Sequence, residues 1–138
     1  MTTARKLNFS DVFKMAKIIG KAELKQNIIN LFFEGEEKRK ALIKEFENDE
    51  ERTEKLEKVR ESMGVDFFFA LIEKAPSAEK EIYGFLGGLA EMKAEEIERA
   101  PIGEIVELIG DIVKTNEDIT DFFISALRSP TLELSTKS

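Results

Sequence analysis

The side chains of this sequence that can do chemistry are carboxylates and hydroxyls, because none of its 138 residues is Cys or His. The chain therefore lacks the commonest ligands of zinc and iron–sulfur clusters and the usual general base near pH 7. Two acidic groups have the residue types that bind hard cations or transfer protons: Glu95, Glu96 and Glu98, and Glu104, Glu107 and Asp111. Both occupy outward faces of predicted helices, so we interpret them as solvated surface and expect no metal and no cofactor.

The hydroxyl and glycine residues also indicate structure rather than catalysis. Hydroxyls near the starts of predicted helices are explained as caps, since no neighbouring base can activate them: Ser10, Ser77 and Thr115 (with Asn116 as the alternative to Thr115). Gly84, Gly87 and Gly88 lack the Gly-Lys-Ser/Thr ending and the preceding strand of a phosphate-binding loop. The spacing of Gly84 and Gly88 favours the close approach of another helix, with a merely tolerated weak helix as the alternative.

Hydrophobic residues recur with the 3.6-residue period of helices, and no segment shows the sustained alternation of a strand. We predict an all-α fold, a compact bundle of about seven short amphipathic helices in one domain of residues 1–128, with a flexible tail at 129–138. The helices are expected at 10–20, 21–33, 66–74, 77–89, 94–99, 101–113 and 115–126. The cleanest core-facing stripe belongs to the sixth: Ile102, Ile105, Val106, Ile109, Ile112 and Val113.

The middle segment, residues 34–64, is mostly charged. Its few apolar residues lie toward its ends, and 47–55 contains none, so a coiled coil is not predicted. We interpret the segment as a solvated helical arm or a partly disordered linker within the domain. The alternative is a mobile arm that folds onto a partner through Leu42, Ile43 and Phe46.

Several helices carry more apolar surface than one core-facing side requires. The helix at 66–74 is expected to turn Phe68 and Ile72 to the core. Other apolar side chains of this helix, of the helix at 21–33 and of the last helix fall beside or opposite the core-facing stripe. We name five candidate partner-binding residues: Ile29, Phe33, Phe67, Phe69 and Ile124. The alternative is that these helices are central and buried on both sides.

Charge and hydropathy exclude two classes of partner. The net charge of −7 argues against binding that works by neutralising phosphates, so no nucleic-acid partner is expected. No apolar run approaches the ~20 residues that span a bilayer, and the start of the chain lacks the apolar region of a signal peptide. We therefore expect a cytoplasmic protein that is not secreted and does not contact a membrane.

Three blocks of the sequence resemble parts of the tail assembly chaperones of long-tailed phages, chiefly those that infect Gram-positive hosts. The blocks are FSDVFKMAKIIGKA at 9–22, FALIEKAP and EKEIYGFL within 69–86, and API, EIVELI and DFF within 100–123. Together they cover most of the chain outside 34–64 and the tail. They are diffuse helical blocks without a catalytic signature, and the charged middle segment lies outside them.

The resemblance implies a non-enzymatic protein that binds the long helical tape measure protein and keeps it soluble. Tail tube subunits would displace it as they polymerise, so it would act in the host cytoplasm and be absent from the mature virion. In this family a longer product often arises by programmed frameshifting near the end of the frame. The resemblance transfers no binding residues, and self-association stays open.

Two other function classes stay open beside this one. The first is a helical protein-binding adaptor, or an acidic inhibitor that mimics nucleic-acid charge and gathers carboxylates on one face. The second is a carboxylate-based, metal-dependent enzyme, which requires a concave cluster of buried acids.

Overall fold

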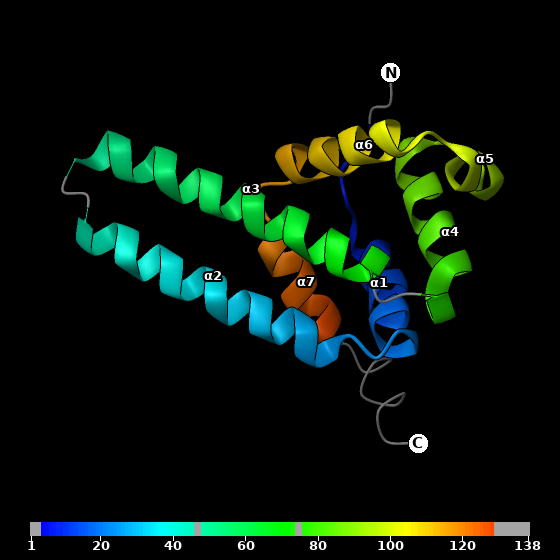
Figure 1. The fold of residues 1–138 in the computed structure, drawn as a ribbon, viewed down its shortest axis with the longest axis horizontal. Helices are drawn as coiled ribbons and strands as arrows, with labels where there is room; N and C mark the ends of the chain where they lie inside the picture. The colour runs from blue at the N-terminus through cyan, green and yellow to red at the C-terminus, as the bar shows by residue number, and fades with distance from the viewer. Residues whose placement is uncertain (1–3, 46–47, 74–75, 129–138) are drawn as a thin grey trace.

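A computed structural model describes residues 4–45, 48–73 and 76–128, so the predicted tail at 129–138 lies outside the described residues. The described residues form seven α-helices, one 3₁₀ turn and no strand: α1 (Phe9–Lys21), α2 (Lys25–Glu45), α3 (Asp49–Glu73), η1 (Pro76–Ala78), α4 (Glu79–Ala90), α5 (Ala94–Arg99), α6 (Ile102–Thr115) and α7 (Ile119–Leu127). The predicted all-α class is confirmed (Figure 1). None of these helices is long and apolar enough to cross a membrane.

The core is built around α1, which packs against α7 and α4. Met15 and Ile19 of α1 are fully buried, as the 3.6-residue period predicts. Aromatic rings from three other helices contact one another in the same core: Phe67, Phe68, Phe85, Phe122 and Phe123. The later turns of α6 complete it with Ile109 and Ile112.

The N-terminus of α1 is capped by Asn8, so the prediction that Ser10 caps it is wrong. The Asn8 side chain accepts a hydrogen bond from the Asp11 backbone, and the Asp11 carboxylate accepts one from the Asn8 backbone at 2.8 Å. This reciprocal pair needs an acceptor side chain three residues after the cap, and Asp11 has that spacing from Asn8 but not from Ser10. Ser10 lies inside the first turn and donates its hydroxyl proton to Asn8 Oδ1.

The other two predicted caps are also wrong. The Ser77 hydroxyl donates to the Lys21 carbonyl at 3.2 Å, and α4 begins after Ala78 without a side-chain cap. Thr115 is the last residue of α6, and the Asn116 amide donates back to the Ile112 carbonyl at 2.8 Å. The Ser77 hydroxyl therefore bonds the C-terminal end of α1, and the Asn116 amide bonds the end of α6, so neither caps the start of the next helix.

A short extended segment before α1 joins three parts of the fold. The Ala4 backbone donates to Asp111 of α6 at 2.7 Å, and the Arg5 backbone donates to the Leu89 carbonyl of α4 at 2.9 Å. The Leu7 backbone donates to the buried Asn116 side chain at 2.9 Å. Asp111, which we predicted to be solvated surface, is half-buried and holds this segment in place.

The charged middle segment is helical in its described part, and it forms the arm of a hairpin. Residues 34–45 belong to α2 and 49–64 to α3, and the two helices run antiparallel and project beyond the other helices (Figure 1). Phe46, one of the side chains considered for folding onto a partner, lies outside the described residues. The predicted helix ends at Phe33 and before Asp66 are wrong, because α2 and α3 each run through them.

Gly64 permits close packing at the point where we predicted a helix end. A Cβ added there would lie 3.0 and 3.1 Å from the two γ-carbons of Val113 and 3.3 Å from Ile119. The glycine therefore lets α6 and the start of α7 approach α3 closely, and this tertiary packing outweighs the ~1 kcal/mol that glycine costs a helix. The predicted close approach at Gly84 and Gly88 is wrong, since added Cβ atoms there meet nothing nearer than Arg5 at 4.0 Å.

Two predicted core faces are confirmed only in part: Phe68 of α3 and Ile109, Ile112 and Val113 of α6 are buried as predicted. Between residues 66 and 73 of α3 the buried side chains are Phe67, Phe68 and Leu71, whereas Ile72 is 45% exposed. On α6, Ile102 is 82% exposed and Val106 is also exposed. The neighbours of α6 contact its later turns, at Asp111 and Val113 for example, which leaves its first turn uncovered.

Candidate functional site: a groove between two helices

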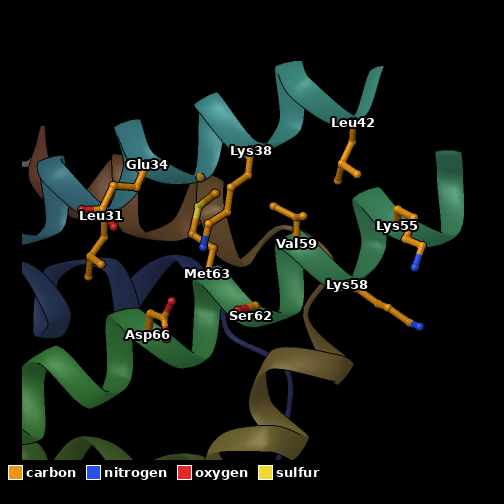
Figure 2. Close-up of a pocket in the computed structure, with 11 residues that line it drawn as sticks. Leu31, Glu34, Lys38, Leu42, Lys55, Lys58, Val59, Ser62, Met63 and Asp66 are labelled. Atoms are coloured by element: carbon orange, nitrogen blue, oxygen red, sulfur yellow. The ribbon is translucent and has the colours of Figure 1, made fainter. Parts of the chain in front are cut away.

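The hairpin of α2 and α3 carries an open groove along one side (Figure 2). Side chains of α2 reach it from one helix face, because Leu31, Gly35, Lys38 and Leu42 are spaced by three or four residues. Opposite them, α3 contributes Val59 and Met63 together with neighbouring polar residues. The volume of the groove is about 300 Å³.

The two helices approach closely at Gly35, which sets the register of the groove. A Cβ at Gly35 would overlap the end of the Met63 side chain, whose sulfur would lie 3.0 Å away. Met63 is itself buried, and the Thr120 hydroxyl of α7 lies 3.9 Å from its sulfur. Gly35 and Met63 therefore pin the base of the hairpin to the core, while the arm continues beyond them.

The floor of the groove is apolar and its rim is charged. Leu31, Leu42 and Val59 are each half-buried, so they keep apolar surface accessible along the groove. Exposed polar side chains form the rim: Glu34, Lys38, Lys55, Lys58, Ser62 and Asp66. This combination of an apolar floor and a polar rim is what a groove needs to hold the apolar face of an amphipathic helix.

Arg60 anchors the arm on the side away from the groove. Its guanidinium donates to the carbonyls of Val113 and Asn116 at 3.2 and 2.9 Å, at the C-terminal end of α6, where a cation is favoured. It also pairs with Glu57; this hydrogen bond lowers the pKa of the Glu57 carboxyl and raises that of the Arg60 guanidinium. Arg60 therefore fixes the orientation of α3 against α6, and the lysines of the rim take no part in that contact.

The structure places the five sequence-predicted binding residues in different environments. Phe33 is 61% exposed and Phe69 40% exposed, whereas Ile29 and Ile124 are half-buried. Phe67 is only 1% exposed, and its ring centroid lies 4.6 Å from that of Phe123. The expectation of an exposed Phe67 is therefore wrong, because α3 turns this ring into the core.

The five predicted residues do not form the groove. None of them lines it, and among the aromatic contacts of the described residues none joins Phe33 to Phe69. The residues that sequence reasoning missed are Leu31, Val59 and Met63, and Leu42 was considered only as part of a mobile arm. The sequence shows the helical spacing of these residues within α2 and within α3. Which residues of α2 lie opposite which residues of α3 depends on the register of the hairpin.

The acidic residues named from the sequence lie apart from the residues that line the groove. Within residues 4–45, 48–73 and 76–128, no group of three or more acidic side chains converges on a position for a metal ion. Glu95, Glu96 and Glu98 are exposed, as are Glu104 and Glu107, in agreement with the predicted solvated faces.

Comparisons with protein-family models, with curated proteins and with solved structures gave no match to this chain.

Proposed function

We propose that this protein is a non-enzymatic assembly chaperone that binds an amphipathic helix of a long helical partner in the groove between α2 and α3. The observation that carries the proposal is the accessible apolar floor, which begins at Leu31 on the edge of the core and continues along the charged arm through Leu42 and Val59. Full burial of an exposed side chain of this kind contributes about 1.5–3 kcal/mol, so completing the burial of each half-buried residue of the floor contributes a part of that amount. The charged rim keeps the unbound arm soluble.

The sequence resemblance supports a particular partner for this activity. Tail assembly chaperones hold the tape measure protein, a long helical chain that needs its apolar surface shielded before the tail tube forms. By this proposal the present protein binds the tape measure protein in the host cytoplasm, tail tube subunits displace it, and the mature virion does not contain it. By the same proposal the groove is the contact surface, which the resemblance leaves unassigned.

Co-expression with the long helical protein encoded beside it tests this function. The partner is expected to become soluble and to co-purify with the wild-type chain. The Leu42→Ser variant is expected to weaken the complex about tenfold or more, because it removes one apolar side chain from the floor. A matched control is Ile43→Ser, which changes an exposed neighbour on α2 that does not line the groove.

Two other outcomes of these experiments would argue against the proposed function or the proposed contact. A partner that stays insoluble and uncomplexed beside the wild-type chain contradicts the chaperone function. Equal losses in the Leu42 and Ile43 variants place the contact elsewhere on the arm. Phe33→Ser reports separately on the exposed aromatic surface of α2, since Phe33 lies outside the groove.

One observation favours the acidic inhibitor as a second candidate. Five carboxylates share one face of α3 around a shallow depression: Asp49, Glu50, Glu54, Glu57 and Glu61. A charge-mimicking inhibitor is expected to bind a basic protein through this face, with an affinity that falls steeply as the salt concentration rises from about 50 to about 500 mM. Binding through the apolar groove is expected to change far less over the same range, so a salt titration of the purified complex separates the two.

A further inference from the structure

The charges along the groove are separated by sign. Glu34 and Asp66 lie at its base near Leu31, whereas Lys55 and Lys58 start from the part of α3 nearer the tip of the hairpin, with the Lys58 side chain pointing away from α2 (Figure 2). Lys38 starts on α2 between these two ends, and its side chain reaches across the groove to Met63 in the same view. The groove is therefore acidic where it meets the core and basic toward the tip of the hairpin.

These rim charges remain available to a ligand. All five side chains are exposed, and in the described part of the chain only Lys58 has a carboxylate within ion-pair distance, Glu54 at 4.0 Å. That pair is itself exposed on both sides, so it competes weakly with a ligand. Arg60, by contrast, is committed to Glu57 and to backbone carbonyls of α6 and the following residue.

The length of the groove fits a short helical segment. From Leu31 to Leu42 the α2 helix rises about 16 Å at 1.5 Å per residue, which corresponds to about three turns of a partner helix. Such a segment places apolar side chains at i, i+4 and i+7 over the floor, and the residues that flank this stripe then face the charged rim.

We infer that the groove selects a charge-polarised amphipathic helix of about three turns, with acidic side chains at the end over Lys55 and Lys58. The opposite end, over Glu34 and Asp66, carries basic or neutral side chains. This inference rests on the proposed function for its site, but it specifies the chemistry and the placement of the bound segment. The basis is charge complementarity along an apolar groove, which fixes register and excludes wrong partners.

Two synthetic helical peptides of identical composition and apolar stripe test the inference. One gathers its flanking acids at one end and its flanking bases at the other, and the second interleaves them. By fluorescence anisotropy the polarised peptide is expected to bind the full-length chain about tenfold more tightly, because only that arrangement forms exposed ion pairs at both ends of the groove. The double variant Lys55→Glu/Lys58→Glu is expected to abolish this preference.

A matched control separates local recognition from net charge. Lys40→Glu/Lys44→Glu makes the same change in net charge on the same arm, but neither lysine lines the groove. This control is expected to keep the preference for the polarised peptide. A nitroxide on the acidic end of the peptide is expected to broaden the NMR signals of Leu42 and Lys55 more than those of Leu31.

Each result decides a distinct question. Equal affinity for the two peptides, no binding of either, or equal losses in both double variants overturns the inference. If the co-expressed partner is nevertheless solubilised through a contact sensitive to Leu42, the proposed function stands without the charge selection. If the polarised peptide binds as expected but the encoded neighbour stays insoluble, the groove chemistry stands and the proposed partner falls.

Discussion

Replacing Asp11 by Asn is expected to lower the free energy of unfolding by about 2–4 kcal/mol at neutral pH. The Asp11 carboxylate is 1% exposed and accepts hydrogen bonds from Arg5 Nη1 at 2.8 Å and Nη2 at 3.0 Å, and from the Asn8 backbone at 2.8 Å. An Asn side chain retains one acceptor oxygen and turns an amide donor toward the guanidinium. The change therefore weakens both the cap of α1 and the contact that holds the preceding segment.

The pH dependence of this effect has a defined sign. Burial alone raises the pKa of the Asp11 carboxyl, but the hydrogen bonds from Arg5 and from the Asn8 backbone outweigh burial, so the pKa in the folded protein lies below its usual value. A carboxyl with a lowered folded pKa contributes stability above its unfolded pKa of about 4, and this stability is lost as the pH falls through the folded pKa. The gap between the wild type and Asp11→Asn is expected to narrow over that range.

Urea unfolding of both proteins between about pH 2 and pH 7 measures this gap. Lys14→Ala is the control, because the Lys14 ammonium lies 4.0 Å from Asp11 but is 58% exposed, and such pairs contribute less than about 1 kcal/mol. A gap that stays constant down to pH 2 contradicts the assignment of the effect to the ionised carboxylate.

Local periodicity was sufficient to predict the class of the fold and the inward face of α1. Val12, Met15, Ala16 and Ile19 recur at helical spacing, and all four are buried. Because such a stripe depends on the residues of one helix alone, it can be predicted from the sequence. The cap at Asn8 was missed because Asn and Ser have similar cap preferences, and the choice depends on the partner Asp11.

The hairpin and its groove depend on contacts between segments far apart in the chain. Gly64 has a weak local preference for helix, and only the approach of Val113 explains why α3 continues through it. In the same way, nothing in the sequence around Gly35 indicates that the Met63 side chain packs against it. The groove follows from the register that this contact sets, so no pattern within α2 or α3 alone could predict it.

The exposed aromatic residues illustrate the same limit. Phe67, Phe68 and Phe69 are consecutive, and a rotation of α3 by one residue decides which of them are buried. Phe123 of α7 contacts Phe67 and Phe68, which leaves Phe69 at the surface. The sequence indicates that this helix carries more apolar side chains than its core-facing side requires. Which of these side chains stay exposed is determined by the position of α7.

Replacing Gly87 by Ala is expected to destabilise the fold, whereas the same change at Gly84 is expected to stabilise it. A Cβ at Gly87 would lie 2.6 Å from the Met92 carbonyl oxygen and 3.5 Å from the Ala94 nitrogen. The chain turns back over α4 at this point, with Glu91 at φ 57° and the Met92 backbone donating to the Gly87 carbonyl at 2.8 Å. Because the obstacle is backbone, the corner between α4 and α5 has to move.

The two substitutions form a matched pair on one helix. Each gains up to about 1 kcal/mol of helix propensity, and only Gly87→Ala adds a steric cost of about 1–3 kcal/mol or more for forcing an atom into packed structure. Gly84 has no atom within 4 Å of an added Cβ, so its variant is expected to be about 0.5–1 kcal/mol more stable than the wild type. Since the gain in helix propensity is common to both, urea unfolding is expected to separate the two variants by the steric cost alone, about 1–3 kcal/mol, and equal stabilities would show that the corner relaxes freely around position 87.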